Sequence, residues 1–153
     1  MNAETVFRDE VVVDCTIYLQ DMIRKIRFGY VCQDILYNRY FPVVGEGRQK
    51  AAIELLRFDC EVGANDAIKW MEEHKLRPAR IEELLALVAA YPDLWRQFPK
   101  IVALGSQHLD YAYHGIYSAV GVWLHSGGKG YGLATVQLFN YFENWYCFAC
   151  VRA

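Results

Sequence analysis

The N-terminal part of the chain has an apolar run followed by an amphipathic segment. Residues 6–13 end in three consecutive valines, and β-branched residues in a short apolar run favour a β-strand. The next segment ends near Gly29, a residue type that commonly terminates helices. Its apolar residues recur at the spacing of one helix face: Leu19, Met22, Ile23 and Ile26. The pattern therefore predicts a strand and then a helix.

The segment after residue 40 has two interpretations. Residues 41–44 and 53–58 are both apolar and flank the sequence Gly45-Glu46-Gly47, which favours a β-hairpin. Residues 51–56 could equally form a helical turn, because short apolar runs do not separate the two by periodicity. We favour the strand.

Two helices are predicted between residues 65 and 90. Asn65 is a suitable N-cap for a helix that contains Ile68 and Met71 and extends to His74. A second helix follows the Arg-Pro-Ala sequence at residues 77–79. Its apolar face is formed by Ile81, Leu84, Leu85 and Val88.

After the second helix the pattern changes to turns and strands. Tyr91-Pro92 ends that helix, since a proline disfavours helical geometry in the residue before it. One further helical turn is predicted at residues 94–98. Residues 101–104 have the composition of a buried strand. No linker, repeat or low-complexity tract divides the 153 residues. We therefore expect one α+β domain, with two main helices packed on a small, mostly antiparallel sheet and a long loop-rich C-terminal region.

Composition changes abruptly after Ser106. Of the chain's 34 charged side chains, only Asp110, Lys129 and Glu143 lie in residues 107–150. An even spread would place about ten charges there. The same stretch holds six of the eleven tyrosines, six of the eleven glycines and three of the four histidines. The domain thus divides into a scaffold (residues 1–106) and a compositionally distinct region (residues 107–150).

The tyrosine-rich region has two interpretations. Tyrosine provides a rigid contact area with a polar tip, and glycine, serine and asparagine provide adaptable hydrogen bonding, as in antibody binding sites. Aromatic residues also fill the interior of β-sheets, so a tyrosine-rich core is the alternative. Tyr131 follows the glycine-rich residues 127–130, where little core is expected. It is our strongest candidate for exposure.

Charge and composition argue against several classes of partner. A net charge of -2 and a pI near 6.1 give no basic footprint for nucleic acid. No apolar run approaches the roughly 20 residues of a membrane span, so we expect no membrane insertion. The N-terminus lacks the features of a signal peptide, which predicts a cytoplasmic location. The five cysteines are odd in number and scattered, which favours reduced thiols.

No catalytic constellation is evident, and we expect no enzyme activity, cofactor or metal. His108, His114 and His125 lack an accompanying Gly-x-Ser-x-Gly motif. Cys147 and Cys150 have CxxC spacing but no second such pair for a zinc site. Residues 127–130 evoke a phosphate loop without its Gly-Lys-Ser/Thr ending.

Three motifs carry a family resemblance. They are Arg-Pro-Ala-Arg-Ile-Glu-Glu-Leu-Leu-Ala at residues 77–86, Phe-Pro-Lys-Ile-Val-Ala-Leu-Gly-Ser at 98–106, and Phe-Ala-Cys-Val-Arg at 148–152. Together they resemble the variable proteins of diversity-generating retroelements. That family has a C-type lectin fold of the formylglycine-generating-enzyme-like subtype. The likeness extends over residues 6–152, including residues 39–47 and 58–68.

The resemblance implies that a reverse transcriptase rewrites adenine positions in the C-terminal coding region. The affected codons yield Tyr, His, Asp, Asn, Ser, Gly, Phe or Cys, and cannot yield Lys, Glu, Gln, Met or Trp. The near absence of Lys and Glu in residues 107–150 fits this process. The chain would then be a binding protein for variable ligands, and we expect these ligands to be proteins.

The resemblance also implies two interleaved sets of residues. The implied variable, ligand-binding positions are Tyr111, Tyr113, His114, Tyr117, His125, Tyr131, Tyr141, Asn144, Tyr146 and Cys147. These should gather on one exposed face. The implied inward-facing scaffold residues are Trp123, Leu124, Leu138, Phe139, Phe148 and Val151. The family's ending has Arg before the final Phe and Leu-Ala after it, whereas residues 147–150 here are Cys-Phe-Ala-Cys, so the last sites can shift by a residue or two.

Two alternatives accompany the binding hypothesis. A thiol oxidoreductase related to the formylglycine-generating enzymes would use Cys147 and Cys150, and requires reactive thiolates. Calcium-dependent carbohydrate binding is disfavoured, because one Asp and one Glu in residues 107–150 are too few ligands for a calcium cage. The sequence identifies neither the ligand nor the oligomeric state, and leaves display on a virion or a cell surface open.

Overall fold

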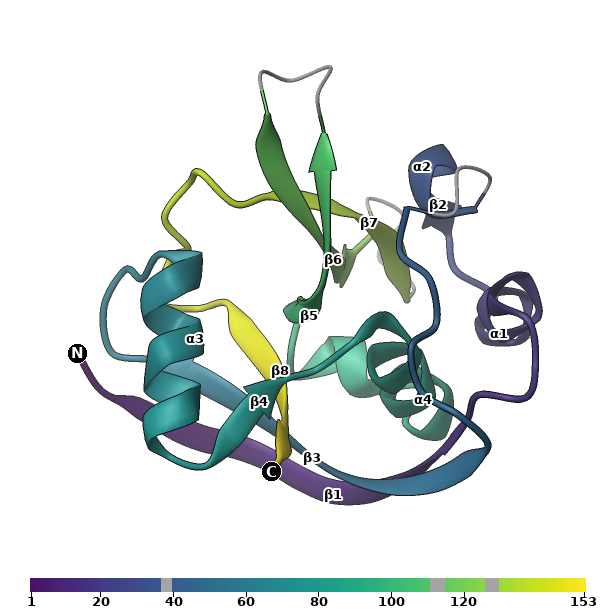
Figure 1. Cartoon of the computed structure of the whole chain (residues 1–153), viewed down its shortest axis with the longest axis horizontal. Helices are drawn as coiled ribbons and strands as arrows, with labels where there is room; N and C mark the ends of the chain where they lie inside the picture. Colours follow the sequence, from purple (N-terminus) through teal and green to yellow (C-terminus); the bar gives the residue numbers. More distant parts are fainter. Residues whose placement is uncertain (37–39, 111–114, 126–129) are drawn as a thin grey trace.

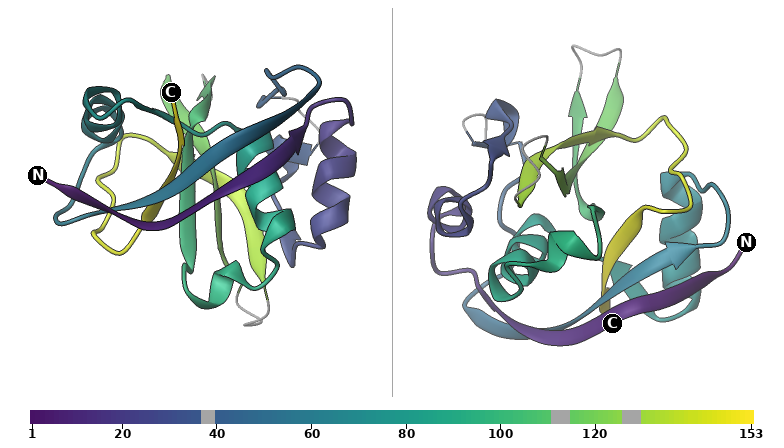
Figure 2. Two further views of the ribbon diagram at one scale, coloured as in Figure 1. Left: turned by 90° about the horizontal axis from the view of Figure 1, so that it is seen from below. Right: turned by 180° about the vertical axis from the view of Figure 1, so that it is seen from behind.

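The N-terminal apolar run forms the first strand of a mixed sheet. The computed structural model describes residues 1–36, 40–110, 115–125 and 130–153. Strand β1 (Ala3–Asp14) pairs antiparallel with β3 (Arg48–Phe58), and Figure 2 shows the pair as a long ribbon that crosses other strands. The predicted opening strand is confirmed, and its partner is the segment for which we favoured a strand over a helical turn.

The described strands belong to one eight-stranded sheet. Its order is β1-β3-β8-β5-β6-β7-β2, with β4 beside β8 (Figure 1). The remaining strands are β2 (Tyr30–Val31), β4 (Leu76–Pro78), β5 (Lys100–Asp110), β6 (Ile116–Leu124), β7 (Tyr131–Gln137) and β8 (Cys147–Arg152). The β5–β8 and β2–β7 pairs are parallel and the others antiparallel. The α+β class is confirmed, and the sheet is larger than expected because residues 100–137 supply three strands instead of mainly loops.

The predicted hairpin around Gly45 is wrong. Residues 41–46 are not part of a strand, and β3 pairs with β1 and β8. The backbone N–H groups of Val44 and Gly45 instead donate to the carboxylate of Glu82, at 2.9 and 2.8 Å. A buried side chain from a distant helix thus supplies the hydrogen bonds that a hairpin partner would have supplied.

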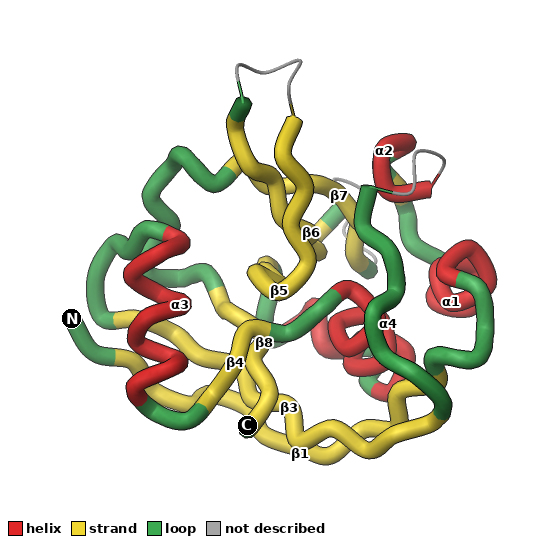
Figure 3. Tube along the Cα trace, in the orientation of Figure 1, coloured by secondary structure: helices red, strands yellow, loops and turns green. Residues whose placement is uncertain are grey.

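Four α-helices are present in the described chain (Figure 3). Their bounds are α1 (Leu19–Ile26), α2 (Gln33–Leu36), α3 (Ala64–Glu73) and α4 (Ile81–Ala90), and a 3-10 turn follows at Leu94–Arg96. The predictions for α1, α3, α4 and the added turn are confirmed. The N-cap of α3 is Gly63 rather than Asn65, and α1 ends before Arg27, which adopts a left-handed φ of 58°.

Apolar residues pack against both faces of the sheet. One cluster includes Met22 and Ile23 of α1 and Leu84 and Leu85 of α4. The other includes Ala67 and Met71 of α3. In the orientation of Figure 3, α3 lies at the opposite side of the strands from α1 and α4. The central strand β8 contributes to both, with Cys147, Ala149 and Val151 in the first cluster and Phe148 and Cys150 in the second.

The three motifs of the family resemblance meet at one place, which we call the scaffold junction (β4, the start of α4, the middle of β5 and β8). The N–H of Ala79 donates to the carbonyl of Ala149 at 2.9 Å, and the N–H of Gly105 donates to the carbonyl of Ala79 at 2.8 Å. The N–H of Ile81, in the first turn of α4, donates to the Ser106 hydroxyl at 2.8 Å. Each motif therefore satisfies backbone groups of another.

Glu83 fixes the start of α4 within this junction. Its carboxylate accepts two hydrogen bonds from the guanidinium of Arg77, at 2.8 and 2.6 Å, and one from the backbone N–H of Arg80 at 2.8 Å. These bonds raise the pKa of Arg77 by more than burial lowers it. Glu83 is buried although it is a charged residue of a helix, because it caps the helix and pairs with Arg77.

Glu54 of β3 is a second buried acid beside the junction. Its carboxylate accepts bonds from Arg152 at 3.0 and 2.7 Å, from Arg8 at 3.0 Å and from the Thr5 hydroxyl at 3.0 Å. Burial raises the pKa of this carboxyl, but the bonds from Arg152, Arg8 and Thr5 outweigh burial and leave the pKa below its ordinary value. The network connects β1, β3 and β8.

In the parts of the chain that the structure describes, no helix combines the length and apolar character required to cross a membrane.

Candidate functional site

The ten predicted contact residues differ widely in exposure. Tyr117, Tyr141 and Asn144 are exposed, and His125 and Tyr146 are half-buried. Tyr131 and Cys147 are buried. The predictions for Tyr111, Tyr113 and His114 fall on residues 111–114, outside the described residues.

The expected exposure of Tyr131 is wrong. This residue opens β7, pairs with Leu124, and is 4% exposed. Its side chain belongs to the core cluster on the α4 side of the sheet, and its hydroxyl donates to the backbone carbonyl of Phe98. Burial raises its pKa. Gly130, with φ of 87°, provides the turn that directs the chain into the strand. Tyr131 is therefore scaffold.

The expected exposure of Cys147 is also wrong, and the geometry of Cys147 and Cys150 argues against thiol chemistry. Both residues are 0% exposed, and they lie in the core clusters on opposite faces of the sheet. Burial raises the pKa of Cys147, and it raises that of Cys150 to about 12. A buried thiol with a raised pKa has little of the thiolate form that an oxidoreductase needs.

The residues predicted to face inward also differ in exposure. Phe148 and Val151 are buried as expected, and Trp123 and Leu138 are half-buried. Leu124 is 41% exposed and Phe139 is 60% exposed, so both expectations were wrong. Phe139 follows the last residue of β7, Gln137, in a turn, where alternation along a strand no longer determines the direction of the side chain.

A segment of nine residues, 138–146, contains three exposed aromatic side chains, and we call it the aromatic loop. It connects β7 to β8 and passes the N-terminal end of α3 (Figure 1). Phe139, Tyr141 and Trp145 are 60%, 71% and 43% exposed. The N–H of Leu138 donates to the carbonyl of Tyr117 at 2.9 Å, which places the loop beside that exposed tyrosine.

The aromatic loop is held at its middle by a buried residue. Phe142 forms a β-bridge with Val62, through two backbone hydrogen bonds of 3.1 and 2.8 Å. Its ring is 2% exposed and meets the ring of Phe148 edge to face at a centroid distance of 5.2 Å. One loop residue thus packs in the core while its neighbours face solvent. The arrangement presents aromatic side chains from a fixed backbone, which reduces the entropy lost on binding.

A cavity of about 320 Å³ lies between the aromatic loop and the sheet, and we call it the loop cleft. Its residues from the sheet are Lys100, Trp123, Thr135, Val136 and Gln137, and those from the loop are Asn140, Tyr141, Phe142 and Tyr146. The ammonium of Lys100 donates to the Tyr146 hydroxyl at 3.0 Å. It also lies over the rings of Tyr146 and Trp123, at 4.3 and 4.9 Å from their centroids.

His125 lies apart from the aromatic loop. It follows the end of β6, whereas Tyr117 lies at the start of that strand, and eight residues of extended chain span about 26 Å. The imidazole packs against Gly29, where a Cβ atom would come within 2.7 Å of its Cδ2. The expectation that the predicted positions form one face is therefore wrong for His125, because β6 separates it from Tyr117.

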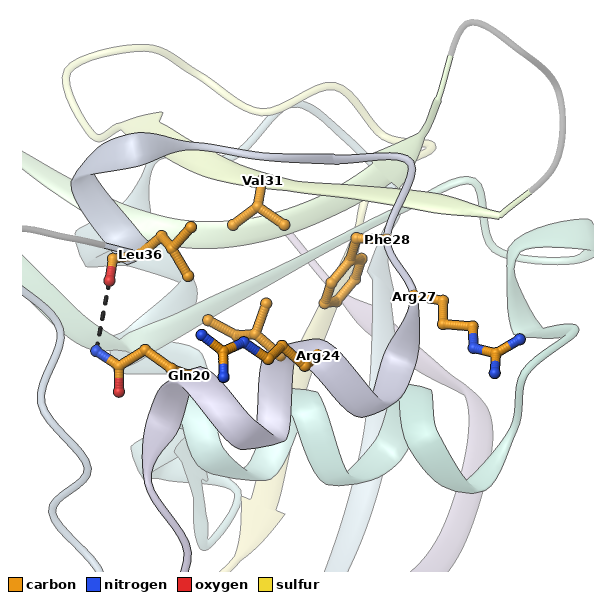
Figure 4. A pocket seen from close by; sticks show the side chains of 7 residues that line it. Gln20, Arg24, Arg27, Phe28, Val31 and Leu36 are labelled. Carbon is orange, nitrogen blue, oxygen red and sulfur yellow. Dashed lines mark hydrogen bonds between the residues drawn. The ribbon is translucent and has the colours of Figure 1, made fainter.

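A second cavity, of about 530 Å³, lies beside α1 and α2 (Figure 4). Its apolar wall is formed by Ile23, Phe28, Val31 and Leu36, and Gln20 donates to the Leu36 carbonyl at 3.4 Å. Two arginines at its edge are Arg24, which pairs with Asp21 at 3.6 Å, and Arg27, whose side chain points away from the other lining residues. No described residue of the C-terminal region lines this cavity, and it shares no described residue with the loop cleft.

The sequence did not reveal the residues that contact one another in and beside the loop cleft. Lys100 was part of a motif, Trp123 was expected only as scaffold, and Trp145 was not considered for binding. One sequence signal was available: Lys100 follows Pro99 and precedes an apolar run, which places it at the start of a strand. Its contacts with Trp123 and Tyr146 depend on strand pairing and on the path of residues 138–146, which sequence spacing does not give.

Comparison with known proteins gives no match, whether to a protein-family model, to a curated protein or to a solved structure. Among the described residues, no three His, Cys, Asp or Glu side chains gather closely enough to hold a metal ion.

Proposed function

We propose that this chain is a ligand-binding protein whose C-terminal surface is diversified by a retroelement, built on a C-type lectin fold of the formylglycine-generating-enzyme-like subtype. We propose the aromatic loop, together with Tyr117, as its contact surface. The observation that carries the proposal is that four aromatic side chains of the loop and of the adjoining strand β6 are exposed: Tyr117, Phe139, Tyr141 and Trp145.

Exposed aromatic clusters have a physical reason to be binding surfaces. Each ring keeps apolar area in water, and contiguous apolar area on a protein surface commonly marks an interaction site. Tyrosine and tryptophan are also enriched at protein–protein interfaces, because their rings bury a large area with few rotatable bonds. A protein ligand therefore suits this surface.

The scaffold junction supports the proposed fold family. The three motifs of the resemblance are distant in the sequence, yet residues 77–86, 98–106 and 148–152 exchange backbone hydrogen bonds. Motifs that assemble one structural unit are what a shared scaffold requires. Among the described residues, the hydrogen bonds of this unit involve none of the exposed aromatic residues of the loop, so the loop can change its side chains without loss of these bonds.

The structure narrows the proposed variable set. Tyr117, Tyr141 and Asn144 stay in it as exposed residues, Tyr146 stays as a wall of the loop cleft, and Phe139 joins it because adenine rewriting can yield phenylalanine. Tyr111, Tyr113, His114 and His125 stay as predictions. Tyr131 and Cys147 leave the set, because a buried position tolerates few side chains.

The DNA beside the gene tests the proposal. We expect a reverse transcriptase gene and a second copy of the sequence that encodes residues 107–150, with adenines opposite the variable codons. If neither the reverse transcriptase gene nor the second copy lies beside the gene, the proposed diversification by a retroelement is contradicted. Binding itself is tested separately, by selecting partners from a displayed library with the purified protein and with a variant that has Tyr117, Phe139 and Tyr141 replaced by serine. Selected partners that bind both proteins equally would contradict the contact surface.

A further inference from the structure

We infer that the loop cleft binds a carboxylate, supplied by an acidic side chain of a protein partner, and that Lys100 is its fixed anchor. The inference rests on the proposed function, because it names the chemistry that the aromatic surface recognises. Lys100 is half-buried at the start of β5, and its ammonium is directed toward the aromatic residues of the cleft.

The ammonium of Lys100 has no carboxylate partner in the described parts of the chain. Its contacts there are the Tyr146 hydroxyl at 3.0 Å and the rings of Tyr146 and Trp123. By contrast, the half-buried Arg77 binds Glu83, and both arginines on Glu54 are paired. An ammonium has three N–H donors, and one hydrogen bond to a hydroxyl leaves two for a ligand.

The charge of the cleft favours an anion. Among the nine described residues that line it, Lys100 is the one that carries a formal charge. Aromatic walls exclude water from one side of the ammonium, so a carboxylate that reaches it interacts in a medium less polar than bulk water. Cation–π contacts hold the ammonium in place without neutralising it. The site is therefore prepared for a negative group.

The size and the other polar groups of the cleft suit a single side chain. A volume of about 320 Å³ lies at the small end of the range for ligand pockets, roughly 300 to 1,000 Å³. The side chains of Thr135, Gln137 and Asn140 provide hydroxyl and amide groups at its edge. These groups can donate to a second carboxylate oxygen, whereas Val136 and Phe142 provide apolar surface for the methylene groups of Glu or Asp.

The proposed diversification gives the two walls different roles. Adenine rewriting cannot produce lysine or tryptophan, so Lys100 and Trp123 would remain constant. Tyr141 and Tyr146, on the opposite wall, belong to the proposed variable set. A constant cation with a changing wall would let each version of the protein keep one strong polar contact while its aromatic residues select the surroundings of the acidic residue.

Lys100 could also act only within the protein, by holding Tyr146 and with it the aromatic loop against the sheet. The two roles are separated by a charge-selective readout. Lys100→Met keeps the length and apolar stem of the side chain and removes the charge. Lys100→Arg keeps the charge, and Tyr146→Phe removes the internal hydrogen bond but keeps the ring.

The experiment is an NMR titration of the full chain that follows the indole N–H of Trp123, assigned with Trp123→Phe. The probes are N-acetylglutamate N-methylamide and its neutral match, N-acetylglutamine N-methylamide, at equal ionic strength. We expect a saturable shift with the glutamate compound and at least tenfold weaker binding of the glutamine compound. Lys100→Met should lose the selectivity, and Lys100→Arg and Tyr146→Phe should retain it.

Equal binding of the two probes, no saturable shift, or unchanged selectivity in folded Lys100→Met would each overturn the inference. Tighter binding of N-acetylneuraminic acid than of the glutamate compound would also overturn it, because a sugar acid would then be the ligand. None of these results bears on whether the codons of the aromatic loop vary, so failure of this inference is distinguishable from failure of the proposed function.

Discussion

The scaffold junction and the aromatic loop differ in which kinds of side chain they bury and which they expose. In the junction, acidic groups that are usually exposed are buried, and Glu83 is paired there with Arg77. In the loop, aromatic groups that are usually buried are exposed, such as Tyr141 at 71%. Burying charge is costly unless it is paired, and exposing rings forgoes hydrophobic stabilisation. The first region thus specifies the fold, and the second is available for contacts outside it.

The largest difference in the free energy of unfolding is expected when a phenylalanine is replaced by alanine, once in the scaffold junction and once in the aromatic loop. Phe148→Ala should lower the free energy of unfolding by about 3 to 5 kcal/mol, because it leaves a cavity at a ring that is 1% exposed. Phe139→Ala should change it by no more than about 0.5 kcal/mol, since that ring is 60% exposed. Urea unfolding followed by circular dichroism measures both. Similar losses in the two variants would abolish the distinction between scaffold and loop.

Two glycines provide the next contrast. A Cβ atom on Gly105 would lie 2.5 Å from the Ala79 carbonyl oxygen and 2.6 Å from that of Pro78, which are backbone atoms of the junction. Gly105→Ala should therefore cost about 3 kcal/mol of stability. Gly63→Ala is the matched control, because its Cβ would meet the Tyr141 ring at an ordinary 3.6 Å. Thermal unfolding of both variants is the measurement, and a Gly105→Ala protein as stable as Gly63→Ala would contradict the packing described.

The buried acid Glu54 should make stability depend on pH. Its pKa is lowered in the folded protein, so its stabilising effect is present above the unfolded value of 4.5 and is lost as pH falls through the lower folded value. Glu54→Gln should lower the free energy of unfolding by about 2 kcal/mol at pH 7. The loss is moderate because the two arginines that pair with Glu54 stay partly in contact with water. Below pH 4.5 the difference between Glu54→Gln and the unmodified chain should shrink. A difference that stays constant from pH 7 to pH 3 would show that the arginine pairs do not stabilise the carboxylate.

The smallest contrast concerns two tyrosine hydroxyls. Tyr131→Phe removes the bond to the Phe98 carbonyl and leaves a buried acceptor unpaired, which should cost about 1 kcal/mol. Tyr141→Phe should be neutral for stability, because that side chain is exposed. Chemical unfolding of the two variants in parallel resolves a difference of this size. A neutral Tyr131→Phe combined with a costly Tyr141→Phe would return Tyr131 to the variable set.

The helices and the first strand were predictable because their signals are local. Ile81, Leu84, Leu85 and Val88 all lie buried on α4, as their spacing requires. The prediction of a hairpin around Gly45 was wrong because the N–H of Gly45 donates to Glu82, which is 37 residues away in the sequence. Local periodicity does not encode such a contact.

The candidate site was less predictable than the fold. Composition identified the C-terminal region, but it could not tell which aromatic residues face outward. Tyr131 follows glycines, yet its hydroxyl reaches the carbonyl of Phe98, 33 residues away in the sequence. Phe139 was expected to face inward, yet it lies in a turn and is exposed. Both errors arise because exposure depends on strand pairing and on where a strand ends.

Deep sequencing of this gene across its native population is the most direct test of the central claim. The account predicts codon variation at Tyr117, Tyr141 and Asn144, which are exposed, and constant codons at the buried Tyr131 and Phe148. Lys100 and Trp123 should also be constant. Uniform codons at Tyr117, Tyr141 and Asn144, or variation at Tyr131 equal to theirs, would contradict it.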